Sequence, residues 1–332
     1  MKRILSVLLA SAFILGLLSS CDSASVEPES TPQLPLTQTF STEELTFSLP
    51  PDCQVATSGR WTAYTIKDVG AVRSTYTTAP LDRTEKGIYS WLQGAFDDMA
   101  EHSFSATNKA YEEITVLGVP AIRGHFDGYA DVQDSESSKI DLVILCGGKY
   151  AYAMVLATSY LPEEQGQLLD DILATAKLAP TDDPYQLEEL FTIHSMDYYL
   201  PKWPSAPGAN MYYHYPDTGG MAAVSYTSGL SVPTDDADAY EKLSAAFDGF
   251  AESQNNVHDT EYANITVADC PAVIGSFSAQ YDPDDDTVSA KYTCAFIQKD
   301  DTVYSFTVAG TSYGTDGQKL FLQAVLDRVS FQ

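Results

Sequence analysis

Histidine, cysteine and serine are the residue types in this 332-residue chain that could carry catalysis or bind a metal. No two of the five histidines stand at the spacing of an HxH or HExxH motif, and no two cysteines form a CxxC pair. The stretch "GSFSA" is nearest to a nucleophilic Gly-x-Ser-x-Gly turn, but it lacks the second glycine. The sequence therefore predicts that the protein is not an enzyme and has no catalytic residue, metal site or cofactor. We expect the histidines at the surface or at helix ends: His102, His125, His194, His214 and His258.

The densest acidic cluster, "DPDDDT", falls short of a calcium-binding loop. Asp282, Asp284 and Asp286 stand at the alternate positions that an EF-hand loop uses. Thr287 stands where that loop needs glycine, and Thr293 where it needs glutamate. The sequence predicts a hairpin turn here rather than a metal site.

The N-terminus carries the pattern of an export signal. Lys2 and Arg3 precede an apolar stretch of about 15 residues, which is too short to span a membrane as a helix and is typical of a secretory signal peptide. The following "LSSC" resembles the lipobox of bacterial lipoproteins, in which the cysteine thiol receives a diacylglycerol. We therefore expect residues 1–20 to be a lipoprotein signal peptide and Cys21 to be the lipidation site. The alternative is an ordinary signal peptide with an incidental cysteine.

Residues 21–43 are rich in Ser, Thr, Pro and Glu and nearly free of aliphatic side chains. Such a segment cannot bury enough apolar surface to fold, and it is predicted to be a disordered tether. At about 3 Å per residue, an extended tether would reach roughly 60 Å. These features predict an extracytoplasmic protein that is anchored to the cell membrane through Cys21.

The formal net charge is -28, and the acidic residues are spread along the whole chain without any basic cluster. This balance argues against a nucleic-acid partner and against adsorption to anionic lipid. It suits a soluble domain that its own charge keeps monomeric.

The sequence contains an internal repeat. "YEEITVLGVPAIRGHF" (residues 111–126) and "YANITVADCPAVIGSF" (residues 262–277) share 8 of 16 positions at an offset of 151. At the same offset, "FSLP" matches "YYLP" and "GAFDDMA" matches "AAFDGFA". We predict two homologous domains, residues 44–179 and 187–332, each large enough for its own core. The polar, proline-bearing "APTDDPYQ" (residues 179–186) would join them.

Hydrophobic periodicity changes in the same order within each half. Three stretches of period two come first, and an apolar stripe at helical spacing follows, in residues 88–99 and again in residues 240–250. Four more strands and a closing helix come next. The predicted order is βββαββββα, and short hairpin connections make the sheet mostly antiparallel. Each half is therefore expected to be an α+β domain in which two helices pack on one sheet.

This order of elements, with "F.LP" in the first strand and "ITV.G.PA" after the first helix, resembles the PsbP-like and DcrB-like family. The resemblance covers both halves, about 280 residues in all. It implies an antiparallel sheet flanked by helices and a non-enzymatic scaffold or binding module, often in exported bacterial lipoproteins. Cys270 stands where the turn of the family usually has glycine, so the second copy departs from the pattern there.

Four cysteines remain besides Cys21, and an exported chain permits disulfides. Pairing within each half would join Cys53 to Cys146 and Cys270 to Cys294. The repeat supports a different interpretation, because three of the four cysteines align with Val or Ile in the other copy. Cysteine would then replace a buried aliphatic residue as a free core thiol.

One stretch, "YYLPKWPSAPGANMYYHYP" (residues 198–216), is unusually aromatic. In a strand, Tyr213 points to the face opposite Tyr212, so some of these rings should be exposed. Exposed aromatic side chains with polar handles often mark contact surfaces. We predict ligand or partner contact for Trp203, Tyr213 and Tyr198. The alternative is that the rings pack in a core, as the alignment of Trp61 and Tyr64 with two of them suggests.

Three functions follow as hypotheses. The first is a non-catalytic, membrane-anchored surface module that binds or scaffolds a protein or a cell-envelope component. The second is a lipoprotein that captures a solute or glycan for a transporter, since stacking rings beside acids suit sugars and cationic solutes. A hydrolase is the least favoured, because no catalytic motif is present.

Overall fold

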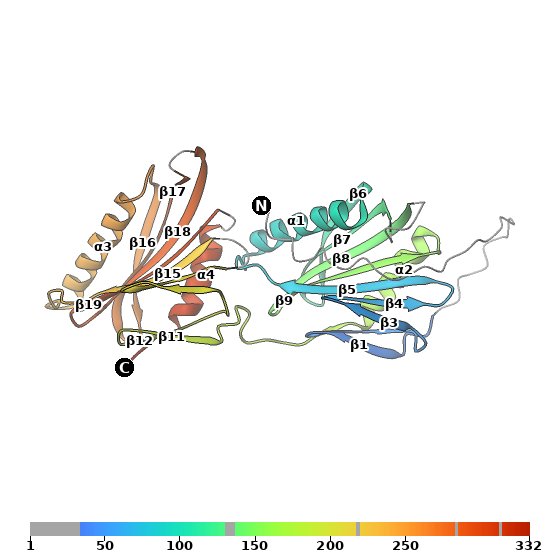
Figure 1. Ribbon diagram of the computed structural model, residues 1–332, viewed down its shortest axis with the longest axis horizontal. Helices are drawn as coiled ribbons and strands as arrows, with labels where there is room; N and C mark the ends of the chain where they lie inside the picture. The colour runs from blue at the N-terminus through green and yellow to red at the C-terminus, as the bar shows by residue number, and fades with distance from the viewer. Residues whose placement is uncertain (1–33, 130–136, 217–219, 283–284, 312–313) are drawn as a thin grey trace. The chain divides into compact units, whose positions relative to one another are not determined.

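The computed structural model describes residues 34–129, 137–216, 220–282, 285–311 and 314–332 (Figure 1). The chain divides into two compact units. The first unit contains residues up to Ala79 and Ile88–Pro184, and the second contains Pro80–Gly87 and Tyr185–Gln332. The boundary at Pro184 lies within the segment that the sequence suggested as a connection. The small segment Pro80–Gly87 groups with the second unit, which the repeat did not predict.

The first unit has ten strands and two helices among its described residues. In chain order they are β1 (Gln38–Thr42), β2 (Leu45–Leu49), β3 (Gln54–Ser58), β4 (Trp61–Ile66), β5 (Gly70–Thr78), α1 (Glu85–Phe104), β6 (Thr107–Val116), β7 (Val119–Gly128), β8 (Ser138–Gly147), β9 (Tyr150–Thr158), α2 (Pro162–Thr175) and β10 (Lys177–Leu178). They form a seven-stranded sheet of order β3-β4-β5-β9-β8-β7-β6 and a small sheet of order β1-β2-β10.

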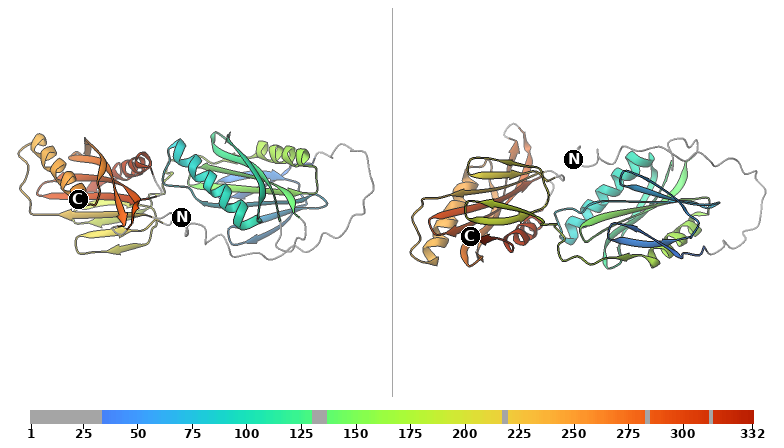
Figure 2. Two further views of the ribbon diagram at one scale, coloured as in Figure 1. Left: turned by 90° about the horizontal axis from the view of Figure 1, so that it is seen from above. Right: turned by 60° about the horizontal axis from the view of Figure 1, so that its bottom comes forward.

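The second unit repeats this arrangement (Figures 1 and 2). Its elements are β11 (Glu189–Ile193), β12 (Met196–Leu200), β13 (Ser205–Pro207), β14 (Met211–His214), β15 (Met221–Thr227), α3 (Asp236–Glu252), β16 (His258–Val267), β17 (Cys270–Asp282), β18 (Asp285–Lys299), β19 (Thr302–Gly310), α4 (Thr315–Leu326) and β20 (Ser330–Phe331). The sheet orders are β13-β14-β15-β19-β18-β17-β16 and β11-β12-β20. Every pair of neighbouring strands in both units is antiparallel, which confirms the predicted α+β class.

Each unit is richer in strands than the predicted βββαββββα pattern. The small three-stranded sheet was not predicted as a sheet of its own, because only its middle strand alternates clearly and the other two strands are too short to show a period. Its first strand, β1, also corrects the predicted tether of residues 21–43, since Gln38–Thr42 is folded. Phe40 explains why, because its ring packs edge-on against Tyr64 with centroids 4.8 Å apart.

Each large sheet is covered on both faces, and the first unit shows how. One face packs against α1, and the other packs against α2 and the small sheet (Figure 2). On the α1 side the core includes Leu92, Phe96, Phe126 and Leu142. On the α2 side it includes Phe47, Tyr64, Leu156 and Leu169. Among the described residues, no helix has both the length and the apolar character needed to cross a membrane.

A glycine at the same position in each unit lets the first helix approach the sheet. A Cβ at Gly124 would collide with the ring of Phe96 and would lie 2.7 Å from the carbonyl oxygen of Ala110. A Cβ at Gly275 would lie 2.5 Å from the ring of Phe247. The two glycines are 151 residues apart, as are the two phenylalanines, so the sequence repeat is also a repeat of packing.

The repeated "ITV…PA" stretch forms a hairpin in both units. Leu117 and Gly118 turn the first hairpin with φ of 55° and 80°, and Ala268 and Asp269 turn the second with φ of 47° and 62°. Two consecutive positive φ angles are the mark of a tight two-residue hairpin turn. The position of Gly118 is thus taken by Asp269, a residue type that tolerates this conformation. The hairpin lies at the edge of each sheet.

Candidate functional site

The aromatic segment of the second unit is split between the core and the surface. Tyr198 is fully buried, and its ring stacks on Phe191 with centroids 5.5 Å apart. The alternation along β12 points Tyr198 inward, together with Met196 and Leu200. The prediction that Tyr198 contacts a partner is therefore wrong, because its side chain belongs to the core.

His214 is the polar partner of Tyr198 in this core. Its Nε2 lies 3.2 Å from the Tyr198 hydroxyl, and its ring meets Phe191 edge-on at 4.6 Å. Burial lowers the pKa of His214 to about 4, so the imidazole is neutral at pH 7. The expectation of a surface position is wrong for His214. It holds for His102, an exposed side chain in the last turn of α1.

Trp203 is half-buried and contributes to packing. Its ring lies 5.4 Å from that of Phe321 on α4 and borders the core of the second unit. Only part of the indole is therefore available for contact. Substituting Trp203 would disturb the packing of the fold as well as any contact surface. Loss of binding in such a variant would therefore not locate the contact.

Tyr213, like Trp203, is only partly exposed. It lies on β14 between Ala206 and Ala223 of the neighbouring strands, and its side chain is half-exposed. Its neighbours along the chain, Tyr212 and His214, point to the opposite face, where they stack with ring centroids 6.2 Å apart. The two residues that pair with Tyr213 across the sheet both have small side chains.

Strand register identifies the equivalent residues of the first unit. Tyr213 pairs with Ala223 as Ala63 pairs with Arg73, which makes Ala63 the counterpart of Tyr213. By the same register Tyr64 is the counterpart of His214. The predicted alignment of Tyr64 with one of the tyrosines is thus wrong by one residue. The register makes Ser205 equivalent to Val55, and the chain from Leu200 to Ser205 is one residue shorter than the equivalent stretch from Leu49 to Val55.

A polar cavity of about 420 Å³ lies elsewhere in the second unit. It is lined by Asp259, Thr260, Glu261, Ser276, Ser278, Lys291 and Thr315. The Lys291 ammonium donates to Ser278 Oγ at 2.5 Å, and Ser276 Oγ donates to Glu261 Oε1 at 3.2 Å. Sequence reasoning missed this site, because common polar residues from β16, β17, β18 and α4 form it without any local motif.

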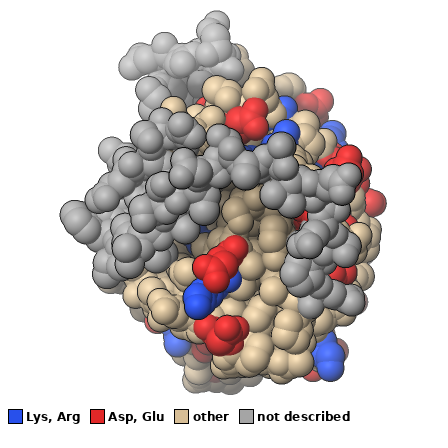
Figure 3. Space-filling view, turned by 90° about the vertical axis from the view of Figure 1, so that its right-hand side faces the viewer, with Lys and Arg blue, Asp and Glu red and all other residues tan. Residues whose placement is uncertain are grey.

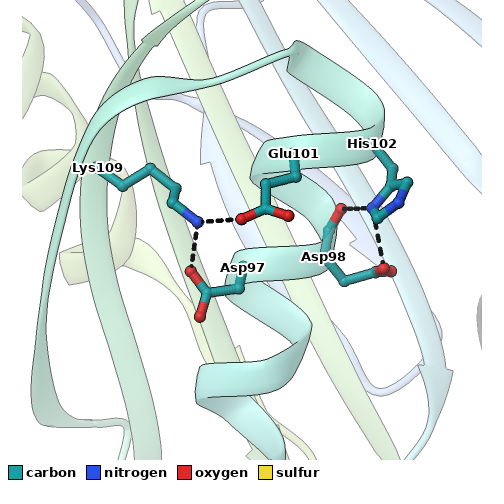
Figure 4. A network of polar contacts seen from close by, with 5 residues as sticks. All are labelled: Asp97, Asp98, Glu101, His102 and Lys109. Carbon is teal, nitrogen blue, oxygen red and sulfur yellow. Dashed lines mark hydrogen bonds and ion pairs between the residues drawn. The ribbon is translucent and has the colours of Figure 1, made fainter. Parts of the chain in front are cut away.

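Charged side chains on α1 form a structural network (Figure 4). Lys109 of β6 donates to Asp97 Oδ1 at 2.7 Å and to Glu101 Oε1 at 2.6 Å. The hydrogen bonds to these two carboxylates, Asp97 first, raise the pKa of Lys109. The network ties the edge strand β6 to the helix. On the face shown in Figure 3, acidic and basic side chains also lie close together, and the described part of it shows no continuous basic patch.

The described cysteines are free thiols. Cys146, Cys270 and Cys294 are buried, and Cys53 is half-buried. The alternative of two disulfides is therefore wrong, and cysteine occupies core positions. Burial raises the pKa of Cys294 to about 12 and that of Cys53 to about 11, so neither is a reactive thiolate at pH 7.

Two further predictions concern particular positions. β17 pairs with β18 at Asp282 and Asp285, which confirms that the acidic cluster joins a hairpin, although residues 283–284 lie outside the described residues. The described residues hold no group of three or more His, Cys, Asp or Glu side chains arranged to bind a metal. Cys21 and residues 1–20 also lie outside the described part of the chain.

No protein-family model and no curated protein matches this chain. Solved structures that are similar to it include cyanobacterial PsbP (CyanoP) from Synechocystis, at 11% identity over 46% of this chain and 99% of that chain, with a TM-score of 0.31. A Pseudomonas aeruginosa protein of unknown function is similar at 14% identity over 43% and 96%, with a TM-score of 0.29. The Pseudomonas aeruginosa immunity protein TplEi is similar at 10% identity over 88% and 96%, with a TM-score of 0.24. At these scores the likenesses carry no argument about function.

Proposed function

We propose that this protein is a non-catalytic, lipid-anchored binding or scaffold module outside the cytoplasm, built from two PsbP-like domains. The lipobox-like "LSSC", the polar segment after it and the acidic chain support this proposal. Cys21 attaches the protein to the membrane. The second unit contacts a protein or a cell-envelope component.

The observation that carries the proposal is the position of Tyr213. A partly exposed aromatic ring on β14 lies between an alanine of β13 and an alanine of β15, and Ala63 takes its place in the first unit. If this position served the core of both units, we would expect an aromatic residue at position 63 as well as at position 213. Tyr and Trp are enriched at protein contacts because the ring supplies area and the hydroxyl supplies a hydrogen bond.

Site-specific photocrosslinking in the native cell tests the proposal. A photoreactive phenylalanine at position 213 is expected to give one discrete adduct. The control is the same probe at Tyr262, which is 47% exposed in the same unit but lies on the edge strand β16. Adducts at neither position, or the same adducts at both, would contradict a contact surface at Tyr213.

One observation favours the second function, capture of a solute. The cavity lined by Lys291 has a volume of about 420 Å³, within the range of roughly 300 to 1,000 Å³ typical of small-molecule sites. Its lining is polar and contains no aromatic ring, so it suits a charged solute better than a stacked sugar.

A further inference from the structure

The two large sheets end in four edge strands, and three of these strands are protected against pairing with another chain. Strands β6 and β16 each have an irregular register and carry charged side chains, such as Glu112 and Glu261. Strand β13 is three residues long and ends in Pro207. Charges, bulges and proline are means by which proteins keep sheet edges closed. The fourth edge strand, β3, has none of them.

Strand β3 presents an open edge of five uncharged residues. Its sequence is QVATS, and every residue from Gln54 to Arg60 is exposed to solvent. Val55 is the largest apolar side chain of the strand, and it is 52% exposed. An exposed edge strand without charges, and with β-branched residues, is a template on which a further strand can pair.

The free backbone groups of β3 belong to Val55 and Thr57. Ser58 and Trp61 close a two-residue turn, so the backbone groups of these two residues bond to each other. Bonding in an antiparallel pair alternates along the strand, so Ala56 also bonds to β4, and Val55 and Thr57 do not. Their N–H and C=O groups therefore point to the open side of β3, where no strand of the described residues pairs with them.

We infer that β3 is a self-association edge, at which two copies of this chain pair antiparallel about a two-fold axis through Ala56. In this register Val55 of each copy lies opposite Thr57 of the other, and the free backbone groups form four hydrogen bonds. An axis through Val55 or Thr57 would place the other of these residues opposite one outside the strand. The inference depends neither on the Tyr213 surface nor on the membrane anchor, so it can fail independently of the proposed function.

Charge complementarity favours a second copy of this chain as the partner. Asp52 and Arg60 are both exposed and lie beyond opposite ends of β3. Antiparallel self-pairing therefore brings Asp52 of each copy to the end at which Arg60 of the other copy lies. The Arg60 guanidinium also lies 5.9 Å from the centre of the Tyr76 ring, a contact that leaves its charge in place.

The net charge of the chain limits the strength of this dimer. Each copy carries a formal charge of -28, so two copies repel each other at long range. Salt screens this repulsion, because the Debye length falls from about 30 Å at 0.01 M to about 8 Å at 0.15 M. We expect a weak, reversible dimer that forms more readily as salt is added, in the class that buries less than about 1,200 Å².

The second unit shows how the same edge is closed. By strand register, Ala206 is the counterpart of Ala56, and Pro207 is the counterpart of Thr57. Proline has no N–H to donate, so β13 cannot form the pairing inferred for β3. The variant Thr57→Pro therefore copies a residue that this fold already accommodates.

Disulfide trapping in the full chain tests the inference. In Ala56→Cys, the two new thiols would lie directly opposite each other, in a non-hydrogen-bonded pair with Cα atoms about 4.5 Å apart. Mild oxidation should give a covalent dimer at least about tenfold faster than in Ala206→Cys, the matched control at the equivalent position of the second unit. The wild type, which retains Cys53, gives the background rate.

Thr57→Pro in the Ala56→Cys chain should reduce trapping to the background rate, because it removes two of the four hydrogen bonds. The melting temperature of this variant should stay at the value of Ala56→Cys. Equal trapping in Ala56→Cys and Ala206→Cys, or trapping that survives Thr57→Pro, would overturn the inference. A crosslink from position 56 to a different protein alone would also overturn it.

Charge reversal decides the matter if Thr57→Pro is unstable. Asp52→Arg or Arg60→Asp alone places like charges at both ends of the pairing, so each should slow trapping at least about threefold. The two changes together restore unlike charges and should restore the rate. If only net charge mattered, Asp52→Arg would speed trapping and Arg60→Asp would slow it, and that result would contradict pairing at β3.

Discussion

At the scale of single residues, where one unit has a buried pair of hydrogen-bonded side chains, the other unit has different residues at both positions. The Tyr198–His214 pair of the second unit stands where the first has Phe47 and Tyr64. Conversely, the first unit has a buried hydrogen bond between Thr42 and Ser74, 2.8 Å long, where the second has Ile193 and Val224. Replacing Thr42 and Ser74 together leaves neither hydroxyl of that pair unpaired, so this exchange costs little stability. His214 differs, because its buried Nδ1 has no hydrogen-bond partner among the described residues.

The buried His214 makes the second unit sensitive to acid. Its folded pKa of about 4 lies below the unfolded value near 6.5, so the unfolded state binds more protons between these pH values. Stability therefore falls as the pH is lowered through this window, by roughly 2 to 3 kcal/mol at pH 4.5. The double variant Tyr198→Phe/His214→Tyr, which copies the first unit, should lack this loss. Urea unfolding of the wild type and the variant at pH 7 and pH 4.5 measures the difference.

The control for this prediction is His258→Tyr, because the His258 side chain is 56% exposed. It should keep the acid sensitivity of the wild type. If the double variant and the wild type lose the same free energy between pH 7 and pH 4.5, His214 is not the group responsible.

From the sequence alone we could predict the strand face on which Tyr213 lies, but not the burial of His214. Alternation along a strand correctly put Tyr212 and Tyr213 on opposite faces. It could not show that His214, which shares a face of the strand with Tyr212, is fully buried, since histidine is common both inside and outside proteins. Nor could it reveal that β3 is an open edge, because this depends on the order of the strands in the sheet.

At the scale of elements, a helix and an edge strand are fixed to each other in the same way in both units. Tyr89 of α1 donates its hydroxyl to the Ile114 carbonyl at 3.0 Å, and Tyr240 of α3 donates to the Ile265 carbonyl at 3.1 Å. Both contacts recur at the offset of 151. The repeated hairpin is therefore held by a helix on one face, and this explains why its sequence is the best preserved between the halves.

Helix packing on the sheet predicts opposite effects for two glycine substitutions. Gly124→Ala forces a Cβ against Phe96 and the Ala110 carbonyl, so it should destabilise the first unit by about 1 to 3 kcal/mol. Gly94→Ala lies on α1 with no atom within 4 Å of the new Cβ, so it should stabilise by about 0.5 to 1 kcal/mol. Urea denaturation measures both. A neutral Gly124→Ala would mean that α1 does not pack this closely.

The elements that the sequence predicted well are those with long periodic patterns. Helix α1 contains the whole predicted stripe of residues 88–99. The small sheet was missed because only its middle strands show a clear alternation. Its short partners, β10 and β20, consist of two residues each and depend on tertiary contacts.

At the scale of the whole molecule, the two units have the same sheet order and separate cores. Each unit buries aromatic and aliphatic side chains on both faces of its own sheet. The features proposed to bind a partner or a solute, Tyr213 and the Lys291 cavity, are both found in the second unit, and the open edge β3 is found in the first. We therefore expect the two units to make different contacts.

The separate folding of the second unit is the central claim, and an amide ¹H–¹⁵N correlation spectrum of residues 185–332 tests it most directly. The cross-peaks of this fragment should be dispersed and should overlay those of the full chain. The fragment omits Pro80–Gly87, which groups with the second unit, so shifts are expected near Gly314, whose N–H donates to Asp82 at 3.2 Å, and among the core side chains that pack with Leu81. A collapsed spectrum, or changes throughout the fragment, would show that the two units share one core and would contradict the account.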